Sequence, residues 1–342
     1  MKSKKLLKDI GEMNLISYIE ELIYKNSEKK VLRDDAFFYS LDKLKEKTSN
    51  KITLVSNSDM LVSTTDVPEK MAFFQIGRKS IIMNLSDLIV KGVKPSGLIL
   101  SLGLPDTMIL KDFEELMNGV ISYSNQFDLN YIGGDLNQTQ EIIINPTVFG
   151  FAENSKIIYR KGMNIEDIIC INGHFGLTGV GFDILLRQEG NYDSFPKYKD
   201  ALDSVLKPSD LGLEGITLSQ HKLATASIDS SDGLSKSLRE LKFSNPQVGI
   251  EISLDKNLIH PKAIEYSEEF DIPIEKLVLD AGEEFIHMFS LNASDFQKAK
   301  TLIEKEGGSL FKIGNVISEP EIFIRKDNKK SVLKSEGYEH FK

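Results

Sequence analysis

Cysteine is nearly absent from this sequence, because Cys170 is the single example among 342 residues. One thiol cannot form a disulfide within the chain, so a disulfide-stapled fold is excluded and a reducing compartment is indicated. Cys170 lies in the apolar run 168–171, where a small buried side chain is a better interpretation than a nucleophile.

Long apolar runs are missing as well. No run approaches the roughly 18 residues that a membrane-spanning helix needs. The basic start of the chain is followed by an apolar segment that is too short and too interrupted for a signal peptide. We therefore expect a cytoplasmic protein that does not contact membranes.

Positive charge is in deficit. The chain has 42 Lys and Arg residues against 51 Asp and Glu residues, which gives a formal net charge of −9. Nucleic-acid binding relies on a surplus of basic residues, so this charge argues against a nucleic-acid partner. Anionic ligands are not excluded, because carboxylates recruit divalent cations that outweigh the local negative charge.

Several common catalytic signatures are also missing. The sequence has no GxxxxGK[ST] loop, no GxGxxG after a strand and no HExxH. Its five histidines are scattered without the spacing of metal ligands, which makes a zinc site a poor interpretation. A Ser-His-Asp set stays open, although no GxSxG elbow supports it.

The length and the pattern of elements favour two domains. A chain of 342 residues with 41% hydrophobic and 27% charged residues is typical of a globular protein that divides into two cores. Helical and strand patterns alternate, which predicts an α+β or α/β arrangement. The pattern relaxes at 153–156, so we expect domains at 1–153 and 154–342.

The individual elements follow from apolar spacing. We expect helices over 1–28, 74–92, 109–127, 234–241 and 293–305, and another that follows the turn 173–176 and ends near 187. We expect strands over 52–55, 96–104, 130–132, 142–151, 168–171, 224–228, 248–254, 279–289 and 309–317. Residues 189–199 are polar and are interpreted as a loop.

The helix expected at 74–92 organises this interpretation. Its apolar stripe consists of Ile81, Ile82, Leu85, Leu88 and Ile89, and Ser80, Asn84, Asp87 and Lys91 fall on the opposite face. Gly92 suits a left-handed end of the helix and Pro95 prevents its return. We expect Asn84 and Asp87 to face away from the core. A solvated polar face without function is the alternative.

Carboxylates recur at the ends of apolar runs, beside Gly and Ser. They are Asp34, Asp35, Asp59, Asp87, Asp135, Asp229 and Asp232. Hard oxygen ligands of this kind suit Mg²⁺, which bridges carboxylates and substrate phosphates. Gly133 and Gly134 before Asp135 would leave backbone amides open to a ligand, as Gly233 would after Asp232. The alternative is that these are ordinary turn residues.

A family likeness extends over nearly the whole chain. IGRKSIIMNLSDLIVKGVKP at 76–95, SLGLP at 101–105, GGD at 133–135, RKG at 160–162 and IDSSDGL at 228–234 resemble thiamine-monophosphate kinases. These belong to the superfamily of aminoimidazole ribonucleotide synthetase, which has the PurM-like fold. The segment 58–71 is more similar to archaeal than to bacterial members.

The resemblance implies a homodimer. The N-terminal domains would pair strands into a β-barrel with flanking helices, and a C-terminal α/β sandwich domain would pack beside each. It also implies ATP as co-substrate and several Mg²⁺ ions at the domain junction.

The resemblance also assigns roles residue by residue. It implies metal ligation by Asp35, Ser58, Asp59, Asp87, Asp135, Asp229 and Asp232, of which Asp35, Asp59, Asp87 and Asp229 would be catalytic. It implies nucleotide contacts from Gly134, Asp135, Arg160 and Ser231, and thiamine phosphate contacts from Asp66, Glu283 and Tyr338.

This sequence departs from the family pattern mainly at the acceptor end. The Gly-Gly-Glu-Asp-Tyr-Glu run of the family stands here as Ala-Gly-Glu-Glu-Phe-Ile at 281–286. Asn57 replaces the usual Ser or Thr and can still offer a carbonyl oxygen to a cation. Asp66 aligns near a His that contacts substrate in bacterial members. The nucleotide half of the likeness is therefore better supported than the thiamine half.

The expected reaction is ATP-dependent phosphorylation of thiamine monophosphate to thiamine diphosphate. The acceptor phosphate is already an anionic nucleophile, with a second pKa of about 6, so direct in-line transfer needs no general base. Bridging Mg²⁺ ions would overcome the repulsion between two polyanions. The alternatives are another ATP-dependent enzyme of the superfamily, acting on a formyl, amidine, carbamoyl or selenide acceptor, and a non-catalytic nucleotide-binding dimer.

Overall fold

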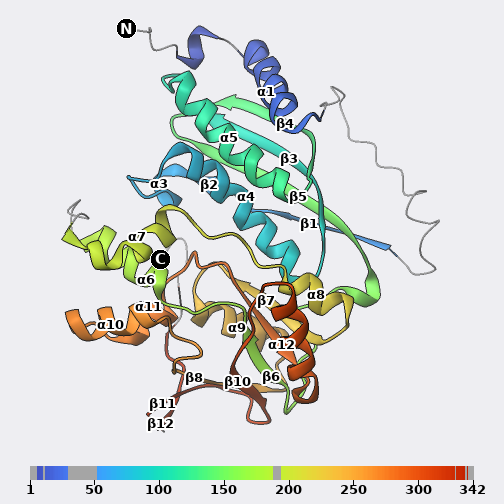
Figure 1. Ribbon diagram of the computed structural model, residues 1–342, viewed down its shortest axis with the longest axis vertical. Coiled ribbons are helices and arrows are strands. Elements are labelled where there is room, and N and C mark those ends of the chain that lie inside the picture. Colours follow the sequence, from blue (N-terminus) through green and yellow to red (C-terminus); the bar gives the residue numbers. More distant parts are fainter. Residues whose placement is uncertain are drawn as a thin grey trace. The chain divides into compact units, whose positions relative to one another are not determined.

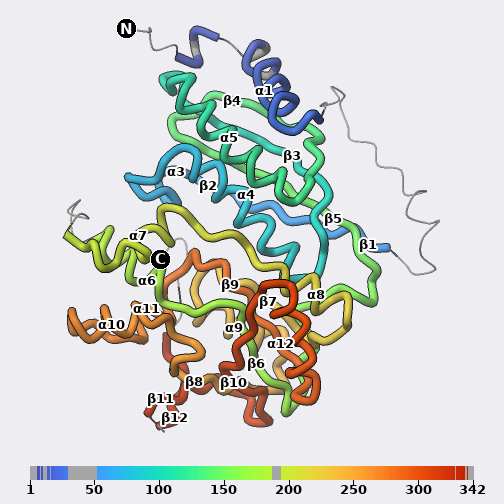
Figure 2. The backbone as a smooth tube through the Cα atoms, in the orientation of Figure 1, coloured from blue at the N-terminus to red at the C-terminus, as the bar shows by residue number. Residues whose placement is uncertain are grey.

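The computed structural model of the protein (Figure 1) describes residues 6–10, 12–29, 52–187, 194–327, 329–335 and 337. Three predicted site residues, Asp34, Asp35 and Tyr338, lie outside these described ranges. The chain divides into two compact units. Figure 2 traces the backbone with colours that follow the residue number. Unit 1 comprises Met1–Leu88 and Lys94–Ser155, and unit 2 comprises Ile89–Val93 and Lys156–Lys342.

Unit 1 is built on a five-stranded mixed sheet. Its strands are β1 (Ile52–Ser58), β2 (Leu61–Val62), β3 (Pro95–Leu104), β4 (Asn130–Gln138) and β5 (Ile143–Glu153). The order is β1-β5-β3-β4, and β2 also pairs with β5. β3 and β4 run parallel, whereas β5 is antiparallel to β1, β2 and β3. Within the described part of unit 1 the sheet is open.

Helices accompany this sheet. They are α1 (Glu12–Ser27), α3 (Ser63–Asp66), α4 (Phe73–Val90) and α5 (Leu110–Gln126), with 3₁₀ turns at Leu7–Asp9 and Asn154–Lys156. α4 and α5 approach so closely that a Cβ on Gly77 would lie 2.0 Å from Leu116 O, and one on Gly119 would lie 1.9 Å from Phe74 O. On the sheet, Leu54 and Ile99 are 58% and 38% exposed.

The prediction of a brief strand that ends before Gly133 is wrong, since β4 continues through Gly133, Gly134 and Asp135 to Gln138. The pairing of β4 with β3 shifts register at this point, and Gly133 has a φ of +137°. A Cβ on Gly134 would lie 1.7 Å from Leu100 O. The two glycines therefore permit an irregular strand to pack closely on its neighbour.

Unit 2 contains a seven-stranded mixed sheet. Its strands are β6 (Ile168–Ile171), β7 (Ala224–Ser230), β8 (Gly249–Ser253), β9 (Ile286–Leu291), β10 (Phe311–Ile317), β11 (Ile322–Lys326) and β12 (Lys329–Val332). Their order is β12-β11-β8-β10-β6-β9-β7, with β8 and β11 parallel and the other pairs antiparallel.

Helices pack on both faces of this sheet. They are α6 (Leu177–Arg187), α7 (Lys199–Leu206), α8 (Glu214–Gln220), α9 (Leu234–Ser244), α10 (Pro261–Phe270), α11 (Ile274–Leu279) and α12 (Phe296–Lys305), with 3₁₀ turns at Pro196–Tyr198 and Ala293–Asp295. β6 shows the layering. Ile169 and Ile171 join a core cluster with α6, α7, α9, α10 and α11. Ile168 and Cys170 join a second cluster with α8 and α12.

This arrangement confirms that Cys170 is a buried side chain, since it is fully inaccessible. The strand predicted over 279–289 is wrong in its first half, because α11 ends at Leu279 and β9 begins at Ile286. Part of the loop predicted over 189–199 is instead the turn Pro196–Tyr198, followed by α7. Among the described residues, no helix has the length and apolar character to cross a membrane.

Candidate functional site

The two predicted carboxylates Asp59 and Asp87 meet in unit 1. Asp59 follows β1 directly, and Asp87 lies near the end of α4. The Asn57 side chain joins them, because its Nδ2 donates to Asp87 Oδ2 at 2.7 Å and to Asp59 Oδ2 at 3.1 Å. Both carboxylates are half-buried. The structure thus brings together two of the predicted metal ligands, 28 residues apart in sequence, through one amide group.

Asn84 holds the backbone of Asp59 in place. Its Oδ1 accepts from Asp59 N at 2.8 Å, and its Nδ2 donates to Asp59 O at 3.0 Å and to Ser80 O at 3.0 Å. Asn84 and Ser80 are fully buried. The expectation that Asn84 faces away from the interior is therefore wrong, and so is the alternative of a solvated face at these two positions. Asn84 is a structural support for Asp59.

The other predicted residues of unit 1 make separate contacts. The Ser58 hydroxyl takes part in hydrogen bonds with Asn145 Oδ1 and Thr147 Oγ1 on β5. Asp66 Oδ2 accepts from Val62 N at 2.7 Å, so the last residue of the short helix α3 caps its N-terminal end. Gly134 and Asp135 are exposed on β4. No hydrogen bond of the described residues links these side chains to the Asp59 and Asp87 carboxylates.

The Asn57–Asp59–Asp87 group has the chemistry of a partial Mg²⁺ site. Mg²⁺ in proteins takes one or two carboxylates and fills its other positions with water and substrate phosphate oxygens. Two carboxylates held by an amide match this pattern. The described residues contain no group of three or more His, Cys, Asp or Glu side chains arranged to hold a metal.

Three predicted residues of unit 2, Asp229, Ser231 and Asp232, lie at the end of β7. Asp229 is the next-to-last residue of that strand and is 6% exposed, whereas Ser231 is exposed. Asp232 is half-buried, and Lys236 Nζ lies 2.7 Å from its Oδ2. Gly233 has a φ of +97°, which turns the chain into α9. Arg160 is exposed and forms an ion pair with Glu240 at 3.3 Å.

His287 is the cross-strand neighbour of Asp229, because the two residues pair in the β7–β9 ladder. The imidazole is fully buried, and this burial lowers its pKa to about 3. Lys91 contributes in the same direction through its positive charge. His287 is therefore neutral near pH 7. Sequence reasoning found no role for it.

The loop 280–285 brings Glu283 beside Ser231. Glu283 N donates to Ser231 O at 2.6 Å, and Phe285 N donates to Ser230 O at 3.0 Å. Glu283 and Phe285 have φ values of +62° and +50°, a region that costs non-glycine residues free energy. This loop connects the predicted nucleotide segment with the predicted acceptor residue Glu283.

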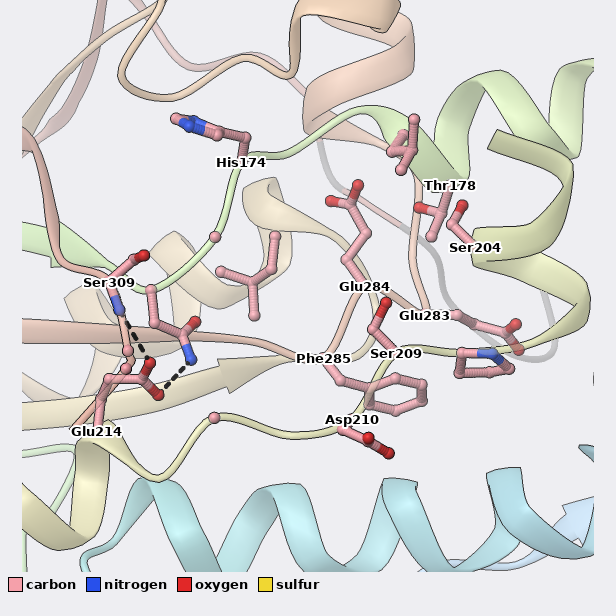
Figure 3. Close-up of a pocket in the computed structure, with 18 residues that line it drawn as sticks. His174, Thr178, Ser204, Ser209, Asp210, Glu214, Glu283, Glu284, Phe285 and Ser309 are labelled. Carbon is pink, nitrogen blue, oxygen red and sulfur yellow. Dashed lines mark hydrogen bonds between the residues drawn. The ribbon is translucent and has the colours of Figure 1, made fainter. Parts of the chain in front are cut away.

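A cavity of about 360 Å³ opens beside this loop (Figure 3). Its walls come from the start of α6, the segment between α7 and α8, the loop 283–286 and the turn 307–309. Four acidic residues line it, namely Asp210, Glu214, Glu283 and Glu284. His174 is the other titratable residue, and the described lining has no lysine or arginine. The cavity therefore favours a cationic or donor-rich ligand over a phosphate.

Glu284 is held at the start of α6. Its Oε1 accepts from Gly176 N at 2.7 Å, and its carboxyl group also interacts with Leu177 N and Thr178 N. Burial is the largest influence and raises its pKa to about 8, whereas these hydrogen bonds act to lower it. In the described structure its buried Oε2 has no hydrogen-bond partner. Because the pKa is raised and Oε1 accepts from Gly176 N, the proton lies on Oε2 near pH 7, and this oxygen can donate to an acceptor on a ligand in the cavity.

Glu214 is a buried carboxylate that the sequence did not reveal. It is 5% exposed, and it accepts from Asn172 Nδ2 at 2.9 Å and from Ser309 N at 3.3 Å (Figure 3). A Cβ on Gly212 or Gly308 would lie 2.0 or 2.6 Å from its carboxylate oxygens. Both partners are neutral, so the negative charge of Glu214 remains for a ligand. Gly212 and Gly308 are the sequence features that leave room for this carboxylate.

Comparison with known proteins supports the same family as the motifs. Residues 33–152 match the AIR synthase related protein family, N-terminal domain. The chain is 33% identical over 299 residues to the thiamine-monophosphate kinase of Nitrosopumilus maritimus, covering 85% of this chain and 90% of that protein. It is 30% identical over 329 residues to that of Pyrococcus horikoshii, covering 95% and 96%.

The fold agrees with this relationship. The structure of AaThiL complexed with AMPPCP and TMP superposes with a TM-score of 0.72 and 25% sequence identity, covering 99% of this chain and 100% of that one. The protein thus has the two-domain α+β, PurM-like fold that the motifs implied. The alignments with its sequence relatives cover most of this chain and most of each relative. The chain belongs to the thiamine-monophosphate kinase family.

Proposed function

We propose that the protein transfers the γ-phosphoryl group of ATP to thiamine monophosphate and so forms thiamine diphosphate. The observation that carries this proposal is the relationship to the kinase of Nitrosopumilus maritimus over 85% of the chain. The AaThiL structure contains AMPPCP and TMP, and this supports the proposal that the fold binds ATP and the acceptor together.

Metal and nucleotide binding are assigned to the predicted acidic residues. In unit 1, Asp59 and Asp87 are the Mg²⁺ ligands that the amide of Asn57 supports, with Asp135 and Ser58 as further contributors. In unit 2, we assign Asp229 and Asp232 to metal ligation and Ser231 and Arg160 to nucleotide contacts. The nucleotide contact of Gly134 stays assigned from the motif alone. Bound Mg²⁺ would neutralise charge on the transferring phosphoryl group.

The acceptor end is assigned to the acidic cavity. Thiamine carries a positive thiazolium ring and an aminopyrimidine that donates hydrogen bonds. A cavity of about 360 Å³ with four carboxyl groups matches this chemistry, and it falls within the usual range for small-molecule sites. Glu283 and Glu214 offer acceptors to the cationic part. Asp66 stays assigned to the acceptor from the motif alone.

The transfer itself is direct and in line. A phosphate oxygen of the acceptor is already anionic near neutral pH, with a second pKa of about 6, so no residue has to remove a proton. The protein positions both phosphates and balances their charge. Burial lowers the pKa of His287 and makes it a weak base, which fits a transfer that requires no histidine base.

The remaining assignments concern assembly and location. We assign the two domains to 1–153 and 154–342, although the compact units change at 155/156 and the second unit also includes Ile89–Val93. The protein acts as a homodimer in the cytoplasm, joined through the strands of unit 1 into a barrel. The exposed apolar side chains Leu54 and Ile99 on that sheet support such a contact.

A panel of acceptors tests the function against its rivals. The purified protein is mixed with Mg²⁺ and ATP, and ADP release is followed with thiamine monophosphate, thiamine, a carbamoyl donor or selenide. The proposal predicts ADP release that depends on thiamine monophosphate. Release with another acceptor favours a different enzyme of the same fold, and a thermal shift with ATP but no release favours a nucleotide-binding dimer.

A further inference from the structure

The Asn57 amide links the carboxylates of Asp59 and Asp87. A single nitrogen, Nδ2, contacts one carboxylate oxygen of each aspartate, at 3.1 and 2.7 Å. The distance of 2.7 Å is that of a charge-assisted hydrogen bond. An N–H₂ group cannot face a cation, because its hydrogens carry positive partial charge. The arrangement therefore stabilises the two carboxylates in the absence of metal.

In the Asn57–Asp59–Asp87 group, the backbones of the two aspartates are fixed, whereas the side-chain amide of Asn57 can rotate. Asn84 fixes the backbone of Asp59 at both N and O, and is itself fully buried. Asp87 belongs to α4, whose ladder sets its backbone. Rotation of the Asn57 amide about one bond exchanges Nδ2 for Oδ1, which turns a donor into an acceptor of similar size.

We propose that Asn57 is a positioning residue with two states: its Nδ2 bridges Asp59 and Asp87 in the metal-free protein, and its amide reverses to direct Oδ1 at a divalent cation. The carboxylates keep their separation in both states. Loss of the two hydrogen bonds then opposes cation binding, so Asn57 weakens the intrinsic affinity for Mg²⁺. This inference rests on the Mg²⁺ assignment within the proposed function.

The variant Asn57→Asp separates the two states. It keeps the shape of the side chain but replaces the donor by an acceptor and adds a negative charge. The metal-free variant then places three carboxylates together, so its melting temperature in EDTA falls below that of the wild type. Its affinity for Mg²⁺ rises by about tenfold, since site charge tunes cation affinity. Gln126→Glu, an exposed amide-to-acid change on α5, is the matched control.

The experiment measures thermal unfolding and titration calorimetry with Mg²⁺ alone, without ATP or thiamine phosphate. The rise in melting temperature from EDTA to Mg²⁺ should be larger for Asn57→Asp than for the wild type and the control. An unfolded Asn57→Asp protein that Mg²⁺ refolds gives the same support. An unchanged Mg²⁺ response overturns the inference, as does a variant that is unfolded in both conditions.

Asn57→Ala provides the second arm. It removes the bridge without adding charge, so its melting temperature in EDTA falls, and addition of Mg²⁺ recovers part of the loss. A purely structural asparagine would show the same loss with and without Mg²⁺, which would overturn the inference. Because these measurements contain no acceptor, they can fail while the kinase assay succeeds, and the kinase assay can fail while they succeed.

Discussion

The side chain of Asn84 hydrogen bonds both backbone atoms of Asp59, accepting from its N at 2.8 Å and donating to its O at 3.0 Å. A backbone peptide in a strand ladder would make the same two contacts. A buried helix side chain thus completes the hydrogen bonding of the chain just beyond β1. Asn84 therefore holds Asp59, one predicted metal ligand, from α4, the helix that carries the other ligand, Asp87.

Replacement of Asn84 by Ala should lower both stability and activity. The change leaves Asp59 N and O without their buried partner, which costs about 1–3 kcal/mol of unfolding free energy. Urea unfolding measures this loss. Asn118→Ala, at a half-exposed position on α5, is the control and should change stability much less. Equal losses for the two variants would contradict the role of Asn84.

Replacement of Asp87 by Asn should remove activity without loss of fold. The carboxylate is half-buried and faces Asn57, while its helix neighbours Leu85 and Leu88 are buried in the core. We expect kcat to fall about 100-fold or more, because a bound metal is worth several kcal/mol of charge stabilisation. Circular dichroism should show an unchanged fold.

Leu85→Ala and Leu88→Ala serve as the opposite case. Both side chains are at most 1% exposed, so each change should cost about 2–5 kcal/mol of unfolding free energy. The fraction that remains folded should keep its turnover. Normal turnover by Asp87→Asn would show that Asp87 has no part in the chemistry.

Replacement of Glu284 by Gln should change the dependence of stability on pH. Burial raises the pKa of Glu284 from 4.5 to about 8 in the folded protein. Between these values the folded state holds a proton that the unfolded state releases, so the stability of the wild type falls as pH rises from 4.5 to about 8. Glutamine has no such proton and lacks this contribution.

Urea unfolding of the wild type and Glu284→Gln at pH 6 and pH 9 measures the difference. The variant should lose less stability than the wild type over this interval, and it still offers an oxygen to Gly176 N. A parallel fall in both proteins would show that Glu284 is already ionised at pH 6.

Replacement of Glu214 by Gln should weaken acceptor binding selectively. The change keeps the size of the side chain but removes the buried charge that faces the cavity. We expect the KM for thiamine monophosphate to rise about tenfold, equivalent to about 1.4 kcal/mol, with little change in the KM for ATP. Glu306→Gln, an exposed change outside the cavity lining, is the control. Equal effects on both substrates would argue for a structural role.

The sequence predicted elements well where spacing alone decides them. The stripe from Ile81 to Ile89 predicted α4, and the burial of Ile81, Ile82 and Leu85 confirms its orientation. Asn84 was misjudged because the sequence does not show that Asp59, 25 residues earlier, is its partner. Helix periodicity identifies a polar face. It does not show whether that face is exposed to solvent or buried against polar groups of another segment.

The errors around the site have similar causes. The apolar residues on either side of 280–285 gave the impression of one strand, whereas positive φ values at Glu283 and Phe285 turn the chain there. The strand before Gly133 was predicted to end there, and the two glycines were expected to leave backbone amides open to a ligand. Instead, Gly134 packs closely on Leu100 O and the strand continues. Glu214 depends on Asn172 and Ser309, which no local pattern connects.

The most direct test of the account is product formation. Purified protein is incubated with ATP, Mg²⁺ and thiamine monophosphate, and thiamine diphosphate is measured by chromatography, with each component omitted in turn. The account predicts one thiamine diphosphate for each ADP, formed only when all components are present. ADP formation without thiamine diphosphate, or no reaction despite binding of Mg²⁺ and ATP, would contradict it.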